Sequence, residues 1–437
     1  MRYASWLFKA FMITTCCLPV ALQAQFSDSI AYMRYNDKRG INVFETPKQT
    51  TITFNGTKIR FGGGFTQEFQ GLKHENSFGK NTTQKLYGIT PGFNTANANL
   101  TMDVALADGI RLNLTSYLSS RHHNETWVKG GYIQFDKLPL KGKLFDDIMK
   151  VTTIKVGHME INYGDQHFRR SDGGHTFYNP FAENYIMDAF ATEIGGEVYV
   201  QKYGALFMAG VTNGLIKGNI DSVTVSPQDQ TQHKNPSVYF KGAYDMQVAE
   251  NIRVRIAASY YHNHSAGNNG NTLYGGDRTG SNYFMVLEPA SGTYSANAFS
   301  GRLNPGFTKK IDAYQFNAFV KAGGVELFGT YERARGRNKS ETWSRKMKQF
   351  AIDGVYRFGN NENLFVAGRY NYVNGRLQDI DEPITVERLV GSAGWFITRN
   401  VMLKGEYVVQ KYFDFPAADI RNEGKFYGYV IAATVGF

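Results

Sequence analysis

The feature that most constrains this chain is an alternation of apolar and polar residues that continues for longer than an ordinary strand. Counting back from Phe437, every second residue of the C-terminal segment is apolar or aromatic, namely Val435, Ala433, Ile431, Tyr429 and Tyr427. A period of two puts one set of side chains on each face of a β-strand. The alternating segments run for about ten to thirteen residues, whereas an average strand has about five or six. The greater length is what a tilted strand needs to cross a bilayer.

The same alternation recurs along the chain and predicts the fold class. In one segment Ile252, Val254 and Ile256 alternate with Arg253 and Arg255. We therefore predict an all-β fold, a transmembrane antiparallel up-and-down β-barrel of about 16 strands. The predicted strands cover 58–71, 97–106, 109–121, 126–136, 150–161, 189–200, 204–212, 237–247, 251–263, 312–322, 324–334, 347–358, 364–374, 386–397, 400–413 and 426–437.

The connections between these strands sort by length in the way that an outer-membrane barrel requires. Such barrels have short turns on the periplasmic side and long loops outside. If the last strand ends in the periplasm, the predicted inner turns are short, and 137–149 is the one exception. The predicted outer connections include 72–96, 162–188, 213–236, 264–311 and 414–425.

The N-terminus predicts export. Arg2 and Lys9 precede an apolar run over 10–22, which is the layout of a secretory signal peptide. We predict a signal peptide over 1–24, a periplasmic N-terminal segment over 25–49 that lies either in the periplasm or in the lumen, and the barrel over 50–437. The run 50–54 is compatible with one more short strand. The two cysteines, Cys16 and Cys17, fall in the signal peptide, so no disulfide is expected.

Composition excludes several classes of protein. After residue 25 no stretch approaches 18 consecutive apolar residues, and the mean hydropathy is −0.38, which excludes an inner-membrane helical protein. The isoelectric point of about 9.2 would suit nucleic-acid binding, but the basic residues are dispersed along the strands instead of clustered. We expect no nucleic-acid partner.

Taken together, the signal peptide, sixteen long alternating strands, short inner turns and terminal Phe resemble the general and phosphate-selective porins of Gram-negative bacteria. The resemblance implies a water-filled channel in the outer membrane for passive diffusion of small hydrophilic solutes. It also implies a homotrimer, contact with outer-membrane lipid, and recognition of the C-terminal strand by the barrel-assembly machinery. In such porins the third outer loop, here 162–188, folds into the barrel and narrows it.

Charged residues of that loop and of the inward strand faces are the candidate selectivity site. Fixed charges at a constriction select ions. The candidate constriction and pore-lining residues are Asp165, Arg169, Arg170, Asp172, Arg111, Arg253, Arg255, Arg369, Lys404 and Glu406. The alternative is that these charges only pair with one another and the loop stays outside. The net charge of +10 falls to +8 without the signal peptide and suggests an anion preference.

Two other functions remain open. An outer-membrane enzyme would need a catalytic motif, and the chain has neither a Gly-x-Ser-x-Gly elbow nor a His-Glu-x-x-His motif. His158, His167 and His175 lie near the third loop, but their spacing matches no metal-ligand signature. We expect no enzyme activity, no cofactor and no metal. The alternative function is a docking or secretion-partner barrel with long outer loops, in which 264–311 would offer aromatic contact residues.

Overall fold

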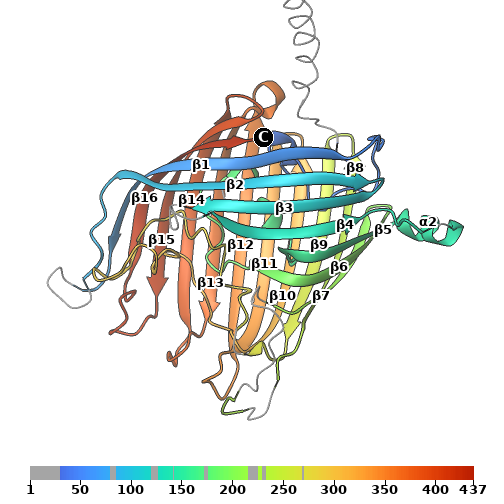
Figure 1. Cartoon of the computed structure of the whole chain (residues 1–437). Helices are drawn as coiled ribbons and strands as arrows, with labels where there is room; N and C mark the ends of the chain where they lie inside the picture. The colour runs from blue at the N-terminus through green and yellow to red at the C-terminus, as the bar shows by residue number, and fades with distance from the viewer. Residues whose placement is uncertain are drawn as a thin grey trace, which may run out of the picture.

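The structure, a computed structural model, describes residues 30–78, 85–119, 126–140, 142–171, 176–214, 225–228, 233–267 and 270–437. Sixteen antiparallel strands form one closed barrel in which each strand pairs with its sequence neighbours and β1 closes on β16 (Figure 1). The strands are β1 (Lys58–Glu75), β2 (Gly92–Ala107), β3 (Ile110–Ser119), β4 (Trp127–Phe135), β5 (Thr152–Glu160), β6 (Thr192–Lys202), β7 (Ala205–Thr212), β8 (Ser237–Ala249), β9 (Ile252–Asn263), β10 (Lys310–Ala322), β11 (Val325–Arg337), β12 (Arg345–Phe358), β13 (Leu364–Gly375), β14 (Ile384–Phe396), β15 (Val401–Phe413) and β16 (Lys425–Gly436). The predicted fold class and strand count are confirmed.

The strand bounds differ from the prediction mainly at the outer ends. β1 continues to Glu75 and β2 begins at Gly92, so this hairpin is longer than predicted. The run 50–54 forms no strand, so the suggestion of an additional strand there is wrong. The predicted signal peptide, 1–24, lies outside the described residues.

The barrel closes without leaving a free edge between its first and last strands. β1 and β16 pair from Gly64 opposite Gly436 to Glu75 opposite Lys425. The main chain of Phe437 continues the ladder, because Gly63 N donates to Phe437 O at 2.9 Å and Phe437 N donates to Gly63 O at 3.0 Å. Inside a bilayer every backbone group needs such a partner, so closure lets the sheet lie in lipid.

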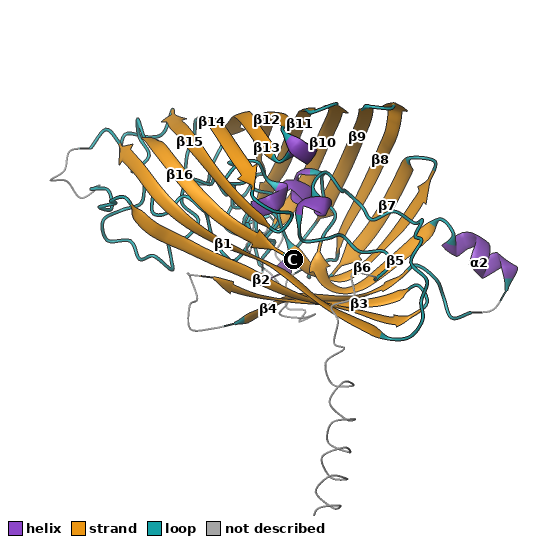
Figure 2. Cartoon of the chain, turned by 90° about the horizontal axis from the view of Figure 1, so that it is seen from above, coloured by secondary structure: helices purple, strands orange, loops and turns teal. Residues whose placement is uncertain are grey.

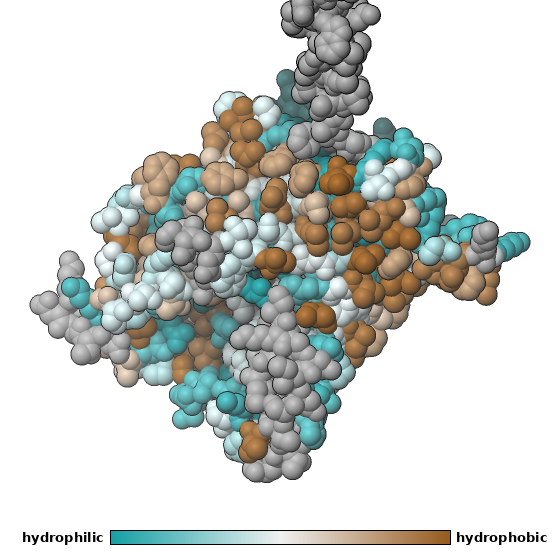
Figure 3. Space-filling model, viewed as in Figure 1, coloured by the Kyte–Doolittle hydropathy of each residue, from teal (hydrophilic) through white to brown (hydrophobic). Residues whose placement is uncertain are grey.

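The two faces of the wall have opposite chemistry. On β12, Phe350, Ile352 and Tyr356 point outward and are exposed, whereas Gln349 and Asp353 point inward and are buried. Figure 3 shows apolar residues gathered over the strands on the visible face. An apolar outer belt around a polar inner face is the arrangement of a membrane barrel.

Loop lengths sort by the two ends of the barrel, as predicted. Turns of a few residues join most strands at one end, and the longer connections lie at the other, where those between β11 and β12, β13 and β14, and β15 and β16 hang below the barrel in Figure 1. The exception, 137–149, contains the short helix α2 (Lys143–Met149). Among the described helices, none is long and apolar enough to cross a membrane.

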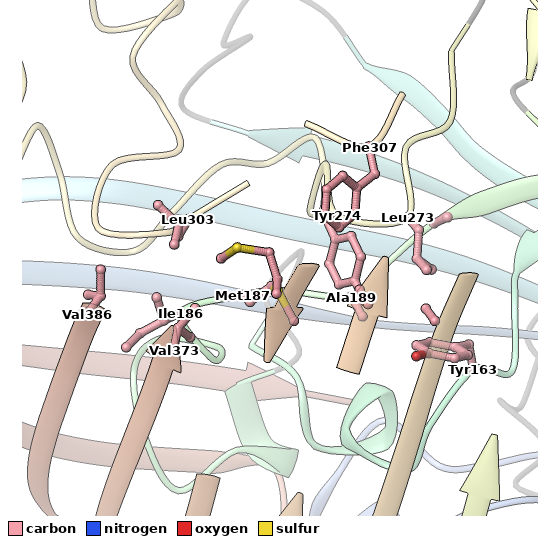
Figure 4. Close-up of a cluster of buried hydrophobic side chains, with 14 of the residues drawn as sticks. Tyr163, Ile186, Met187, Ala189, Leu273, Tyr274, Leu303, Phe307, Val373 and Val386 are labelled. Atoms are coloured by element: carbon pink, nitrogen blue, oxygen red, sulfur yellow. The ribbon is translucent and has the colours of Figure 1, made fainter. Parts of the chain in front are cut away.

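The interior of the barrel is filled by the chain itself. Figure 2 shows loops and short helices inside the ring of strands. The largest buried apolar cluster joins the β5–β6 loop, residues 161–191, and the β9–β10 loop, residues 264–309, to the wall. In Figure 4, Ile186 of the first loop lies beside Val373 of β13, below Leu303 of the second loop. The loop predicted over 162–188 therefore folds into the barrel and narrows the lumen, as the porin resemblance implied, and the β9–β10 loop narrows it further.

Candidate channel and its plug

The N-terminal segment lies inside the barrel, which decides between the two positions that the sequence left open. Its described part begins at residue 30 and contains the 3-10 turn η1 (Lys38–Gly40). Asn36 Nδ2 donates to Thr101 Oγ1 of β2 at 3.1 Å, and Asn42 Nδ2 donates to Glu326 Oε1 of β11 at 2.5 Å. Glu45 accepts from Arg255 of β9 at 2.7 Å. The segment thus reaches wall strands that are far apart around the ring.

The β5–β6 loop folds inward and is held by wall side chains instead of by regular structure. It contains two 3-10 turns, η3 (Gln166–Arg169) and η5 (Thr176–Tyr178). Ala182 N donates to Glu406 at 2.6 Å, Ile186 N to Asn371 Oδ1 at 2.7 Å, and Met187 N to Gln349 Oε1 at 2.9 Å. A buried loop has no water to satisfy its backbone, so these polar wall residues supply the missing partners. We call residues 30–49 and this loop together the plug.

Four charges tie both parts of the plug to the wall, and we call them the plug clamp. Asp165 of the loop accepts from Arg255 Nε at 2.7 Å and Nη2 at 2.9 Å, and lies 2.7 Å from Lys241 Nζ. Glu45 of the N-terminal segment lies 3.0 Å from Lys241 and 2.7 Å from Arg255. Burial alone would raise the pKa of Asp165 and of Glu45, but Lys241 and Arg255 outweigh it and hold both pKa values below their ordinary range. Two carboxylates and two cations leave the clamp neutral.

Arg169 and Arg170, the adjacent arginines that we predicted to face a solute, contact different partners in the barrel. Arg169 donates to Asn42 Oδ1 at 2.6 Å and lies over the Phe328 ring at 5.0 Å. Arg170 instead forms a bidentate pair with Asp188 of the same loop. Burial would raise the pKa of Asp188, but Arg170 and Arg302 hold it below its ordinary value.

The predicted wall residues also bind partners, and Arg253 remains partly exposed while Arg255, Arg369, Lys404 and Glu406 are buried. Arg253 pairs with Asp245 at 2.7 Å and Arg369 with Asp353 at 2.7 Å. Lys404 Nζ donates to the carbonyls of three plug residues, Thr176, Asn179 and Phe181. Glu406 accepts from Tyr283 Oη at 2.7 Å in addition to Ala182 N. Asp172, another predicted residue, lies outside the described residues.

A polar cavity of about 280 Å³ remains between the plug and the wall formed by β2 to β6. Of the predicted pore-lining residues, Arg111 lines it. The neutral polar residues around it include Asn99, Thr101, Asn113, Thr115, Tyr132 and Gln134. The charged residues around it are Arg34, Arg111, Lys129, Lys155, Glu45, Asp103 and Glu160. A lining of amides, hydroxyls and charges of both signs suits a hydrated solute.

The cations of the cavity differ in how far they are neutralised. Arg111 pairs with Asp103, and Lys129 pairs with Asp277. Lys155 donates to Tyr199 Oη at 3.4 Å and lies over that ring at 4.8 Å, and Arg34 donates to carbonyl oxygens of Gly40 and Phe168. Within the described part of the chain, neither Lys155 nor Arg34 has a carboxylate within 4 Å. Glu160, which also lines the cavity, contacts His167 and has no Lys or Arg within 4 Å among the described residues, so the two unpaired cations outnumber the one carboxylate.

Sequence reasoning missed most of these lining residues. Lys129 and Lys155 lie on predicted strands next to apolar residues, and this alternation could have predicted that their side chains face the lumen. Arg34 and Glu45 gave no such sign, because they lie in a segment without periodicity.

His167, in the loop turn η3, forms hydrogen bonds through both ring nitrogens. His167 contacts Glu160 Oε1 through Nδ1 at 3.1 Å and Asn162 Oδ1 through Nε2 at 2.9 Å. Burial lowers the pKa of His167 in spite of the nearby Glu160. In the described ranges no group of three or more His, Cys, Asp or Glu side chains is placed to hold a metal ion. His175 lies outside those ranges.

Comparisons with known proteins identify similar folds among solved structures. No protein-family model matches the chain, and no curated protein matches it. Among solved structures, the anion-selective porin from Comamonas acidovorans aligns over 87% of this chain and 100% of its own, with 9% identity and a TM-score of 0.52. OmpF of Salmonella typhi, in a complex with daunomycin, aligns over 88% and 99%, with 13% identity and a TM-score of 0.50. At these identities the likeness concerns the fold alone: this chain has the 16-stranded β-barrel fold of the porins.

Proposed function

We propose that this chain is an outer-membrane channel for small hydrophilic solutes, which pass along the wall formed by β2 to β6 beside the plug. The observation that carries the proposal is the polar cavity at that wall, which lies in the barrel beside the largest buried apolar cluster of the described residues. A side passage lined by amides and hydroxyls can replace the hydration of a small solute while excluding large ones.

We further propose that the passage prefers anions. Lys155 and Arg34 contribute two positive charges with no carboxylate within 4 Å among the residues described, whereas Asp103 and Glu45 are paired with cations. Glu160 also lines the cavity and contacts His167, so these three groups together contribute one positive charge. Charge at a narrow point outweighs total charge in selecting ions. Of the residues predicted to set selectivity, Arg111 lines the proposed passage. Asp165 and Arg255 instead belong to the plug clamp, which we propose holds the plug in position.

The remaining parts of the assignment complete the proposal. The apolar outward faces support contact with outer-membrane lipid. We propose export by a signal peptide over 1–24, as the basic residues and the apolar run of that segment indicate, and an N-terminal segment over 25–49 that precedes the barrel. Recognition of the C-terminal strand by the assembly machinery and a homotrimer are proposed from the porin resemblance. We propose no catalytic activity, cofactor or metal.

A second candidate function is a docking or secretion-partner barrel. The observation that favours it is the buried plug clamp, in which Asp165 is 1% exposed, because such a closed lumen suits a barrel that conducts nothing. Its long outer loops would then bind a partner.

Conductance in a planar bilayer separates the two candidates. The chain from residue 25 onward would be refolded, checked for heat-modifiable gel mobility, and measured in a salt gradient. The channel proposal predicts small stepwise openings with a reversal potential of anion sign. Folded protein without any openings would contradict it and favour the docking barrel.

A further inference from the structure

A cluster of cations lies on the outward face of the barrel, where lipid is expected. On β11 the outward side chains near the outer end are Arg333 and Arg335, and on β12 they are Lys346 and Lys348. Arg376 follows β13 and is exposed. These five residues, which we call the rim cluster, belong to the end of the barrel that carries the long loops.

Register puts the charges of this cluster directly opposite one another. Arg333 is the cross-strand partner of Lys348, and Arg335 is the partner of Lys346. Arg376 N donates to Lys346 O at 3.2 Å, which brings the third strand to the same level. Directly opposed like charges destabilise a sheet, because their Cβ atoms lie only about 4.5–5.5 Å apart.

The protein itself does not neutralise the rim cluster. In the described residues, none of its five cations has a carboxylate within 4 Å. Asp312 is the cross-strand partner of Arg335, but its carboxylate contacts His262 Nδ1 at 2.7 Å and accepts from Tyr260 Oη at 3.0 Å. An external anion would remove the repulsion.

The outward side chains of β11 to β13 change from cationic to aromatic to aliphatic from the outer end of the barrel toward its middle. Toward the middle of the wall, the row below Arg333 and Lys348 consists of Tyr331, Phe350 and Tyr372, which are aligned across β11, β12 and β13. The rows beyond contain exposed aliphatic residues such as Ile352 and Leu327. A cationic row, an aromatic row and an aliphatic belt follow one another, as for a lipid whose head group is anionic and whose tails enter the membrane.

The surface over the rim cluster is hollowed. A groove of about 600 Å³ is lined by Arg333, Lys346, Lys348, Arg376, Tyr331 and Trp343. Trp343 is 48% exposed, and Arg376 lies 5.9 Å from its ring centroid. Guanidinium and ammonium groups together bind phosphate through charge-assisted hydrogen bonds.

We propose that this groove binds the phosphorylated head group of a glycolipid in the outer leaflet, with lipid A as the chemical type. The rim cluster binds the phosphate, the aromatic row lies at the level of the sugar and upper acyl chains, and the aliphatic belt contacts the tails. The proposal is independent of whether the barrel conducts.

Binding of purified lipid A to the refolded chain in neutral detergent tests this proposal. Native mass spectrometry would count bound lipid and give its affinity. The wild type should bind intact lipid A at least about tenfold more tightly than phosphatase-treated lipid A, a difference of about 1.4 kcal/mol. Equal binding of the two lipids would overturn the proposal without need of any variant.

A matched pair of variants locates the site. Lys346→Gln with Lys348→Gln should weaken binding of intact lipid A about tenfold. Lys73→Gln with Lys411→Gln removes two exposed lysines from other strands and should leave binding unchanged. Equal weakening by both pairs would refute the location. In the last experiment inorganic phosphate competes with bound lipid A. If phosphate displaces lipid A as strongly as unlabelled lipid A does, the groove binds free anions and the lipid assignment is overturned.

Discussion

Asp165 is the residue whose charge should decide whether the plug stays docked. Its carboxylate is buried between Arg255 and Lys241 in the plug clamp. Asp165→Asn leaves those two cations with Glu45 as their shared carboxylate. Removing one partner of a buried ion pair costs about 3–5 kcal/mol. Because Glu45 remains 2.7 Å from Arg255 and 3.0 Å from Lys241, we take the lower end, about 3 kcal/mol.

A loss of this size should raise the population of the released plug by about two orders of magnitude. The assay is thiol labelling of a cysteine introduced at Ala189, a plug residue that is 2% exposed. The refolded chain from residue 25 onward has no other cysteine, because Cys16 and Cys17 precede it. When opening and closing are fast, the labelling rate follows the open population. Longer channel openings should accompany faster labelling.

Asp419→Asn is the control for this experiment, since Asp419 pairs with Arg421 in the β15–β16 loop, away from the plug. The control should label at the wild-type rate. If Asp165→Asn also labels at that rate while the barrel remains folded, the charge of Asp165 does not hold the plug in the barrel.

Three further predictions follow from particular side chains. Lys155→Glu should move the reversal potential toward cation selectivity, because Lys155 lines the cavity, whereas Lys143→Glu on α2 should not. Lys129 outweighs burial and lowers the pKa of Asp277 to about 2, so this pair's contribution to stability is complete above about pH 4 and is lost as the pH falls toward 2. The pH dependence of the gel-mobility transition should show that loss, and Asp277→Asn should remove it. Phe437→Ala should slow assembly in cells but change the unfolding midpoint in urea little, because Phe437 is exposed and buries little apolar surface.

Sequence predicted the wall because the wall follows a local rule. A strand between lipid and a polar interior must alternate, so Ile252, Val254 and Ile256 could be assigned to one face from their spacing. The rule fades at the outer ends of strands, where both faces meet water. There β1 continues through Lys73 and His74 to Glu75 without an apolar outward set, and the prediction ended too early.

The plug was beyond this rule because its partners are distant in the sequence. Asn42 binds Glu326, and Asn162 binds Glu45, across separations of 284 and 117 residues. Charge spacing within the loop was also misleading. Arg169 and Arg170 are neighbours, but Arg169 ends the turn η3 and Arg170 is extended, so their side chains diverge toward Asn42 and Asp188.

Dehydrating the inward polar groups of this barrel costs free energy, and this cost explains why the loop backbone is hydrogen-bonded to the wall. A wide lumen filled with water would leave wall groups such as Lys404, Gln349 and Asn371 hydrated, and none would need a partner from the loop. Once an apolar loop enters, those groups are dehydrated and must be satisfied. The structure meets this demand by pairing them with loop backbone, as Lys404 does with the carbonyls of Asn179 and Phe181. Docking is therefore cooperative: release of the loop rehydrates many groups at once, so a single clamp charge should shift the plug between two discrete positions instead of loosening it gradually.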